Sequence, residues 1–580
     1  MSYPSINDKD FYNKINKIYH KYKIPQKKKT LKEICFPKEF ELQPPQKFVA
    51  KYINPETPYK GILIFHRIGA GKTCTAVRVA EAWKKVRNVI VVVPASLKGN
   101  FRNELRSLCG GNNYLKEDER KQLSKLHPTD EKYKDIIAKS DERINKYYQI
   151  YSYNKFAEAM QLNKIKFKNS ILIVDEIQNM VSERGTYYEI LYNAIMNAPN
   201  DLRIVLLSAT PIFDKPNEIA LTLNLLRIPL ELPTGKYFNA MFVDTIYGKD
   251  DKYHYRAQNL DIFKERIKGY VSYFRGAPPH VFPELIVRYV KCEMSDFQYR
   301  AYLTVMKSED EGKPIKKFKE RFKIFKKEGS IQNLPNNFFI GTRIISNVVF
   351  PNQLINEKGF DSFKGKHITK DLEMYSIKFY KILKKIEKAQ GKVFVYSAFK
   401  EYGGMKSFVR VLEEFGYKNY LEHGEGKKRF AIWSGDEKIS IKEEIRTIYN
   451  RKENLEGKKL KILLGSPSIK EGVSLTAVQQ VHILEPYWNQ SRLEQVIGRA
   501  SRFCSHKDVD AEHRVVKVYI YVAIHHKERE TVDQYIQGLA NQKNKLIKQF
   551  EIALKESAVD CELFKNANVF PGEPDLKCDT

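Results

Sequence analysis

The sequence lacks the long apolar runs of a membrane protein. Its best apolar stretches, residues 89–93 and 171–174, have the length of strands and fall far below the ~18 residues that a membrane span needs. Residues 1–4 are followed by charged residues, without the apolar segment of a secretory signal. We therefore expect a soluble protein with no membrane partner.

Closely spaced cysteine pairs are also absent. The chain has an odd number of widely scattered cysteines and no Cys-x-x-Cys pair. This pattern argues against a disulfide framework and against a structural zinc site, and it predicts free thiols in a reducing intracellular compartment. The cysteines are Cys35, Cys74, Cys109, Cys292, Cys504, Cys561 and Cys578.

Acidic residues are too few to balance the basic ones. The chain has 100 lysines and arginines against 70 acidic residues, a formal net charge of +30. A surplus this large favours a polyanionic partner such as nucleic acid, although a solvated, lysine-rich surface would give the same charge. The hydrophobic content of 42% excludes a disordered chain and fits globular α/β material.

A strand, a loop and a helix are predicted around a phosphate-binding motif. The apolar run 61–64 precedes the loop, in which Gly69 and Gly71 let backbone N–H groups approach phosphate oxygens. Lys72 would reach the β- and γ-phosphates, and Thr73 would offer its hydroxyl to Mg²⁺. The predicted cofactors are therefore ATP and Mg²⁺.

Two further features belong to this motif. His66 stands where the common pattern has its first glycine, so the motif is incomplete by itself. Gln46 opens a helix shortly before the loop, and its amide could bind the adenine edge, although a surface glutamine is the simpler alternative. The predicted nucleotide-binding residues are Gln46, Gly69, Ala70, Gly71, Lys72 and Thr73.

Polar residues follow two more predicted strands. Asp175 and Glu176 come directly after the run 171–174, where Asp175 would hold Mg²⁺ and Glu176 would activate the attacking water. Ser208 and Thr210 follow another buried strand. The carboxyl ends of parallel strands are where α/β sheets place their ligands, so these residues predict one site.

The strand at 89–93 leads into a polar turn containing Ser96, which opens a helix. A helix N-terminus at a strand end can bind a nucleic-acid phosphate, or it can be a simple connection. Further along, residues 315–327 combine aromatics at helical spacing with many lysines. They predict either a core stripe with a solvated face or a helix that follows phosphates.

A second alternation of strands and helices begins near residue 392 and predicts another parallel sheet. We expect two tandem α/β lobes, each a parallel sheet flanked by helices. The expected divisions are an N-terminal extension at 1–40, the first lobe at 41–275, a helical connecting region at 276–371, the second lobe at 372–545 and a tail at 546–580.

The order Gly-Ala-Gly-Lys-Thr, Asp-Glu-Ile-Gln and Ser-Ala-Thr-Pro resembles the first lobe of superfamily 2 helicases. The block Gln-x-x-Gly-Arg-x-x-Arg at 495–502 resembles motif VI, and residues 471–474 resemble motif V. The resemblance implies that the two lobes are RecA-like, with ATP and Mg²⁺ in the cleft between them. It also implies coupling roles for Ser208 and Thr210, and contacts with nucleic acid and the interlobe cleft for Glu471, Gly472 and Ser474.

Motif VI also implies catalytic residues. An arginine fork that arrives from a second lobe can stabilise the charge of phosphoryl transfer. Arg499 and Arg502 are the candidate arginine fingers, and Gln495 would lie near the nucleotide.

Within the superfamily, the chain is similar to the nucleoside triphosphatase I group of poxviruses and other large DNA viruses. This similarity rests on the segments 268–273, 488–489, 505–506 and 531–533. The small subunit of the viral early transcription factor is a related group. The resemblance implies a DNA-dependent ATPase that acts with a viral RNA polymerase and transcription factors in early-gene transcription, in virions and host cytoplasm.

Two classes of function remain open. The chain is either a motor enzyme on nucleic acid, DNA more than RNA, or a promoter-binding factor in which ATP only gates assembly. A helicase that separates RNA or DNA strands is a further alternative. The complete set of hydrolytic residues favours the motor, because a scaffold has no use for Glu176 together with Arg499.

Overall fold

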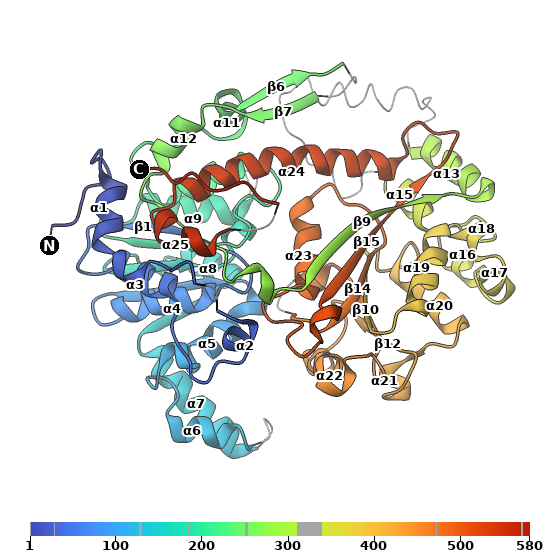
Figure 1. Ribbon diagram of the computed structural model, residues 1–580, viewed down its shortest axis with the longest axis horizontal. Helices are drawn as coiled ribbons and strands as arrows, with labels where there is room; N and C mark the ends of the chain where they lie inside the picture. The colour runs from blue at the N-terminus through green and yellow to red at the C-terminus, as the bar shows by residue number, and fades with distance from the viewer. Residues whose placement is uncertain are drawn as a thin grey trace. The chain divides into compact units, whose positions relative to one another are not determined.

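The computed structural model (Figure 1) describes residues 2–27, 29–126, 130–181, 185–249, 253–309, 339–470, 473–569 and 572–580. Within these ranges the chain forms two compact units, one of residues 1–279 and 545–580 and one of residues 280–544. Each unit is built on a parallel sheet, which confirms the α/β class with two sheets. The domain limits expected from composition stay a prediction.

The described part of the first unit contains a six-stranded parallel sheet in the order β3-β2-β4-β5-β1-β8. Its inner strands are continuous apolar runs because helices cover both faces of such a sheet. Strand β1 lies between β5 and β8, so the residues after β1 and β5 emerge side by side. The strands are β1 (Gly61–His66), β2 (Asn88–Val93), β3 (Tyr148–Ser152), β4 (Ser170–Val174), β5 (Arg203–Leu207) and β8 (Val271–Phe274).

Helices from both ends of the chain complete the core of the first unit. Phe11 of α1, Phe48 of α3 and Phe564 of α25 are fully buried in one cluster with strand β1. The C-terminal segment is therefore part of this unit. Its helices are α1 (Phe11–Ile18), α2 (Leu31–Cys35), α3 (Pro44–Tyr52), α4 (Lys72–Trp83), α5 (Lys98–Arg106), α6 (Glu117–Leu123), α7 (Glu131–Asn145), α8 (Tyr153–Gln161), α9 (Thr186–Met196), α10 (Glu218–Asn224), α11 (Gly235–Phe242), α12 (Leu260–Ile267) and α25 (Cys561–Phe564).

The second unit has, in its described residues, a seven-stranded parallel sheet in the order β11-β12-β13-β10-β14-β15-β9. Its outermost strand, β9, was not expected, since the sequence indicated only a helical connection there. Leu285 and Val287 of β9 are more than 40% exposed, so this edge strand lacks the signal of a buried run. The strands are β9 (Glu284–Glu293), β10 (Lys392–Tyr396), β11 (Lys418–Asn419), β12 (Arg429–Trp433), β13 (Ile462–Gly465), β14 (Val478–Ile483) and β15 (Val515–Ile524).

The long helix α24 (Val532–Glu556) begins in the second unit and ends in the first. The lysine-rich and aromatic pattern at 315–327 lies outside the described residues. The other helices of the second unit are α13 (Asp296–Glu309), α15 (Ile340–Asn347), α16 (Glu357–Ser362), α17 (Lys366–Thr369), α18 (Leu372–Tyr375), α19 (Ile377–Lys388), α20 (Met405–Glu414), α21 (Tyr420–His423), α22 (Ile439–Asn450) and α23 (Gln490–Ala500).

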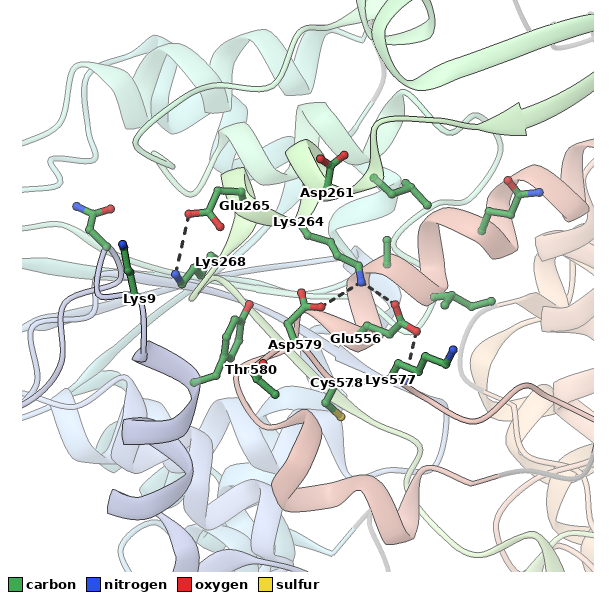
Figure 2. A pocket seen from close by; sticks show the side chains of 16 residues that line it. Lys9, Asp261, Lys264, Glu265, Lys268, Glu556, Lys577, Cys578, Asp579 and Thr580 are labelled. Atoms are coloured by element: carbon green, nitrogen blue, oxygen red, sulfur yellow. Dashed lines mark hydrogen bonds and ion pairs between the residues drawn. The ribbon is translucent and has the colours of Figure 1, made fainter.

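A hairpin of β6 (Val243–Tyr247) and β7 (Tyr253–Ala257) precedes α12 in the first unit. A pocket of about 870 Å³ lies between α12, the end of α24 and the two ends of the chain (Figure 2). Among its charged groups, Lys264 forms ion pairs with Glu556 and Asp579. No residue of the predicted phosphate loop lines this pocket.

Among the described residues, no helix has both the length and the apolar character to cross a membrane.

Candidate active site

The predicted phosphate loop connects the end of β1 at His66 to the start of α4 at Lys72. Gly69 and Gly71 have φ angles of 85° and 70°, a left-handed backbone conformation that residues with a side chain rarely adopt. A Cβ atom on Gly71 would also lie 2.5 Å from the side-chain nitrogen of Gln46. Glycine is therefore required at both turns of the loop.

Gln46 is buried beside this loop. Its Nε2 donates to the backbone oxygen of Gly71 at 3.3 Å, and its Oε1 accepts from the backbone N–H of Gln43 at 2.9 Å. Both hydrogen bonds fix the amide in one orientation. Its contact with adenine stays a prediction, whereas its position next to the loop is explained by these bonds.

Lys72 connects the loop to the acidic pair after β4. Its Nζ lies 3.1 Å from Oδ1 of Asp175 and 2.5 Å from Oε1 of Glu176. Burial opposes the charged ammonium, but the two carboxylates outweigh it and raise the pKa of Lys72. Burial also disfavours the charged form of Asp175 and so raises its pKa, although the nearby charge of Lys72 acts to lower it. The three groups thus form a compact charged cluster that a bound Mg²⁺ and phosphate would rearrange.

The backbone of the acidic pair is held in an unusual shape. Glu176 has a φ of 51°, uncommon for a residue with a side chain and typical of strained functional sites. The hydroxyl of Tyr153 donates to the carbonyl oxygens of Asp175 and Glu176, at 2.6 and 2.8 Å. Tyr153 was not predicted as a site residue, because a tyrosine at the start of α8 gives no sequence signal for this role.

A series of hydrogen bonds runs from the acidic pair to the residues after β5. Nε2 of Gln178 donates to Glu176 at 2.5 Å, and Oε1 of Gln178 accepts from the hydroxyl of Ser208 at 2.6 Å. Oγ of Ser208 in turn accepts from the backbone N–H of Thr210 at 3.0 Å. Gln178 was missed as a site residue, although it closes the Asp-Glu-Ile-Gln motif that drew attention to its neighbours.

Ser96 follows β2 within a short 3₁₀ turn, residues 95–97, ahead of α5. Its backbone lies where the sequence placed it, at the carboxyl end of a strand of this sheet. A contact between Ser96 and nucleic acid stays a prediction.

In the second unit, α23 carries the residues of the predicted motif VI. Oδ1 of Asn489 accepts from the backbone N–H of Arg492 at 3.1 Å and caps the helix. Gln495 is half-buried on this helix and Arg499 is buried, and the backbone oxygen of Arg499 accepts from Leu475 at 2.9 Å. Their roles at the nucleotide stay predictions.

Arg502 joins the predicted motifs V and VI. Its guanidinium donates to the hydroxyl of Ser474 at 2.5 Å and to the backbone oxygen of Gly498 at 3.0 Å. Burial lowers the pKa of Arg502 to about 10, so the group is still protonated at neutral pH. Glu471 and Gly472 lie outside the described residues.

Two family models cover most of the chain. Residues 45–358 match the SNF2-related domain, and residues 377–504 match the helicase conserved C-terminal domain. The chain belongs to the SNF2-related family of superfamily 2 helicases. It is therefore a helicase-type ATPase.

Two relatives of the chain come from large DNA viruses. The chain is 53% identical to "Putative ATP-dependent RNA helicase R563" of Acanthamoeba polyphaga mimivirus, over 100% of this chain and 99% of the relative. It is 27% identical to "Termination factor NPH-I homolog" of African swine fever virus, over 87% and 76%. A Sulfolobus solfataricus SWI2/SNF2 ATPase core solved with dsDNA aligns over 90% of this chain and 93% of that chain, at 16% identity and a TM-score of 0.31. That score is too low to add to the assignment.

One segment that suggested a viral branch of this SNF2-related ATPase has a structural role. Asp533 forms an ion pair of 2.7 Å with Lys378, and both side chains are buried. Lys378 also donates to Asn347, which donates to the buried carboxylate of Glu485. A buried charge is costly without partners, so this network holds α15, α19 and α24 to the sheet of the second unit.

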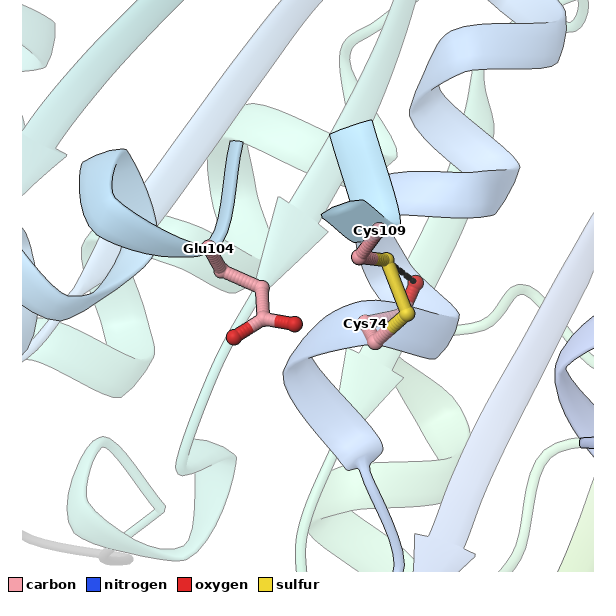
Figure 3. Close-up of side chains that lie close together, drawn as sticks. All are labelled: Cys74, Glu104 and Cys109. Carbon is pink, nitrogen blue, oxygen red and sulfur yellow. Dashed lines mark hydrogen bonds between the residues drawn. A yellow bond between two sulfur atoms is a disulfide. The ribbon is translucent and has the colours of Figure 1, made fainter. Parts of the chain in front are cut away.

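The expectation of free thiols is wrong for six cysteines, since Cys35 and Cys504 are disulfide-bonded in addition to the four described next. Cys74, next to Thr73 in the phosphate-loop helix, is disulfide-bonded to Cys109, and Cys561 is bonded to Cys578. Figure 3 shows Glu104 beside the first bond. Wide spacing in sequence concealed both pairs. The first pair forms because the fold brings α4 next to the end of α5. While the sulfurs of Cys74 and Cys109 are bonded to each other, they cannot join Glu104 as metal ligands.

Proposed function

We propose that this SNF2-related ATPase is a DNA-dependent translocase that acts with a viral RNA polymerase and its transcription factors in early-gene transcription. Its step would be elongation, termination or release of the transcript. The 27% identity to a viral protein named as a termination factor supports this proposal, as does the resemblance of its short segments to that branch. The net charge of +30 is consistent with a polyanionic track.

One observation carries the motor function in particular. A continuous series of contacts runs from Lys72 through Glu176 and Gln178 to Ser208. A change in charge at the phosphates can therefore be transmitted to the residues after β5 through direct side-chain contacts. A factor that only binds ATP needs the loop and the lysine, but it does not need a link between hydrolysis and a second strand end.

The residues present fit ATP with Mg²⁺. The loop offers backbone N–H groups and a lysine to the phosphates, and the hydroxyl of Thr73 and the carboxylate of Asp175 are the hard oxygen ligands that Mg²⁺ prefers. The metal would neutralise charge on the phosphates. Glu176 would orient the attacking water and accept its proton, and Lys72 would release the carboxylates to bind phosphate.

An RNA helicase is the second candidate, since the 53% identical mimivirus relative is named an ATP-dependent RNA helicase. An ATP-gated initiation factor is the third. We favour DNA because the family model that covers residues 45–358 is the SNF2-related one.

The deciding experiment measures phosphate release with single-stranded DNA, duplex DNA, RNA or no polymer. We expect duplex DNA to stimulate turnover most. Stimulation by RNA alone would favour the RNA helicase, and ATP binding without stimulated turnover would favour the gated factor. A strand-separation assay on the same substrates distinguishes translocation from unwinding.

For the location, we propose the host cytoplasm and the virion, by analogy with the viral branch. The paired cysteines remove the argument from free thiols, so the proposal rests on the viral relatives. Western blotting of purified virions and of infected-cell fractions tests it.

A further inference from the structure

His66, the residue that departs from the common phosphate-loop pattern, belongs to a buried polar chain. Its Nε2 lies 2.9 Å from Oγ of Ser272 on the neighbouring strand β8. The hydroxyl of Ser272 also forms a short hydrogen bond with Oδ2 of Asp560, whose Oδ1 accepts from the backbone N–H of Tyr273 at 3.0 Å. The side chains of His66, Ser272 and Asp560 are all fully buried.

The C-terminal segment holds Asp560 against β8. The backbone N–H of Val559 donates to Val271 at 2.8 Å, and Asn568 accepts from the backbone N–H of Arg275 at 3.0 Å. The chain of contacts therefore joins three parts of the sequence that lie far apart. It reaches from the start of the phosphate loop to a carboxyl group near the C-terminus.

One end of this chain lacks a partner. Nδ1 of His66 is buried and has no hydrogen-bond partner among the residues that the structure describes. A buried polar atom in this state has lost its hydration without a compensating hydrogen bond, which destabilises the folded protein. Such atoms are rare in folded proteins, and a catalytic role or a bound water or ion can explain them. Burial lowers the pKa of His66 to about 3, and the positive charge of Lys72 in the loop adds to this effect.

We propose that His66, Ser272 and Asp560 form a proton relay that links nucleotide binding at the phosphate loop to the uptake of one proton. This proposal rests on the proposed ATPase function. His66 acts here as a positioning residue for the loop, and Asp560 stores the proton.

The relay has two arrangements. With Asp560 ionised, the Ser272 hydroxyl donates to the carboxylate and accepts from Nε2–H of His66, so Nδ1 presents a lone pair. A proton that enters at Nδ1 displaces the Nε2 proton to Ser272, and the Ser272 proton moves to Asp560. Nδ1–H is then a donor, and the imidazole stays neutral throughout. An anionic ligand in the loop favours the donor form, so binding draws in one proton.

The surroundings of Asp560 allow this change near neutral pH. Burial raises the pKa of Asp560 to about 7, against the hydrogen bonds from Ser272, the Tyr273 N–H and its own backbone. On the neighbouring elements, Lys555 lies over the Tyr273 ring at 5.0 Å, and the hydroxyl of Tyr12 donates to Ser557. The fully buried environment thus leaves the carboxyl poised between its two forms.

The test measures ATP affinity of the full chain with a fluorescent ATP analogue between pH 6.5 and 8.5, and proton uptake by calorimetry in buffers of different ionisation enthalpy. Above the pKa of Asp560, we expect the Kd to rise by up to tenfold per pH unit, because one proton must be bound. Proton uptake should approach one per nucleotide at pH 8. The titration of the ligand itself is common to all variants and cancels in comparison.

Ser272→Ala breaks the relay but leaves His66 and Asp560 in place. This variant should lose both the extra pH dependence and the extra proton uptake. Asp560→Asn keeps an acceptor for Tyr273 and an N–H donor for Ser272, so it should bind with the low-pH affinity of the wild type at every pH. Ser557→Ala, which removes a buried hydroxyl bonded only within α24, is the matched control and should behave as wild type.

Equal pH profiles and equal proton uptake in the wild type and Ser272→Ala would overturn the relay while leaving ATP binding intact. Absence of nucleotide binding in all four proteins would contradict the proposed function, and the relay with it. Circular dichroism of each variant identifies a loss of folding, and a misfolded Ser272→Ala leaves Asp560→Asn to decide.

Discussion

The hydroxyl of Ser208 donates a hydrogen bond of 2.6 Å to the side-chain oxygen of Gln178. Through this bond the residue after β5 contacts a side chain that also holds Glu176. The bond therefore joins the predicted coupling motif to the predicted base, and its removal should separate hydrolysis from the response to nucleic acid.

Ser208→Ala tests this link. It leaves the Gln178 oxygen buried without its donor, at a cost of about 1–3 kcal/mol. We expect nucleic-acid-stimulated turnover to fall roughly tenfold or more, with a smaller fall in basal turnover. The control is Ser170→Ala, since Ser170 is a buried serine on β4 that bonds only to the backbone of Lys168. Equal losses in basal and stimulated turnover would show that Ser208 has no coupling role.

Glu176→Gln should separate binding from chemistry. The amide keeps the size of the side chain but cannot accept a proton, so turnover should fall by roughly 10²–10⁴. ATP affinity should change little, because Thr73 and Asp175 are the predicted metal ligands. Single-turnover hydrolysis and equilibrium dialysis with labelled ATP measure the two effects. Near-normal turnover would assign the base to another residue.

Lys72→Ala should impair binding and chemistry together. It removes a cation that the structure places against two carboxylates, and it leaves Asp175 and Glu176 to repel both each other and the phosphates. We expect weak ATP binding and no measurable hydrolysis. Equilibrium dialysis with labelled ATP gives the affinity. Wild-type turnover in this variant would mean that the loop is not the nucleotide site.

Arg499→Ala examines the predicted arginine finger in the second unit. We expect ATP binding to persist and turnover to fall by about 10³ or more, the range for such arginines. Arg492→Ala is a control on the same helix, since Arg492 lies over the ring of Tyr487. A loss of ATP binding at normal single-turnover rates would give Arg499 a binding role instead.

The Cys74–Cys109 bond should stabilise the first unit. It closes a loop over a sequence separation of 35 residues, which in the chain-entropy model contributes about 4 kcal/mol. We expect Cys109→Ala to unfold at lower urea than the wild type under non-reducing conditions. Cys292→Ala, at the free buried cysteine, is the control. Thiol titration of the unfolded chain checks the number of paired cysteines, and a count of seven free thiols would exclude the bond.

Local patterns were sufficient for the elements that carry the motifs. The continuous apolar runs predicted β1, β2, β4 and β5 because strands buried on both faces have no polar residues to interrupt them. The glycines of the loop were also predictable, because the positive φ angles at Gly69 and Gly71 favour glycine over other residues. Edge strand β9 had no such signal, because its side chains are largely exposed.

The sequence by itself determined the family, the order of the motifs and the kinds of group at each strand end, because these depend on short stretches of chain. Only the tertiary structure decided which distant groups meet. The pairing of Cys74 with Cys109, the insertion of Gln178 between Glu176 and Ser208, and the contact of His66 with Asp560 through Ser272 all join separate elements. Such contacts depend on how helices and strands pack, and no local spacing encodes them.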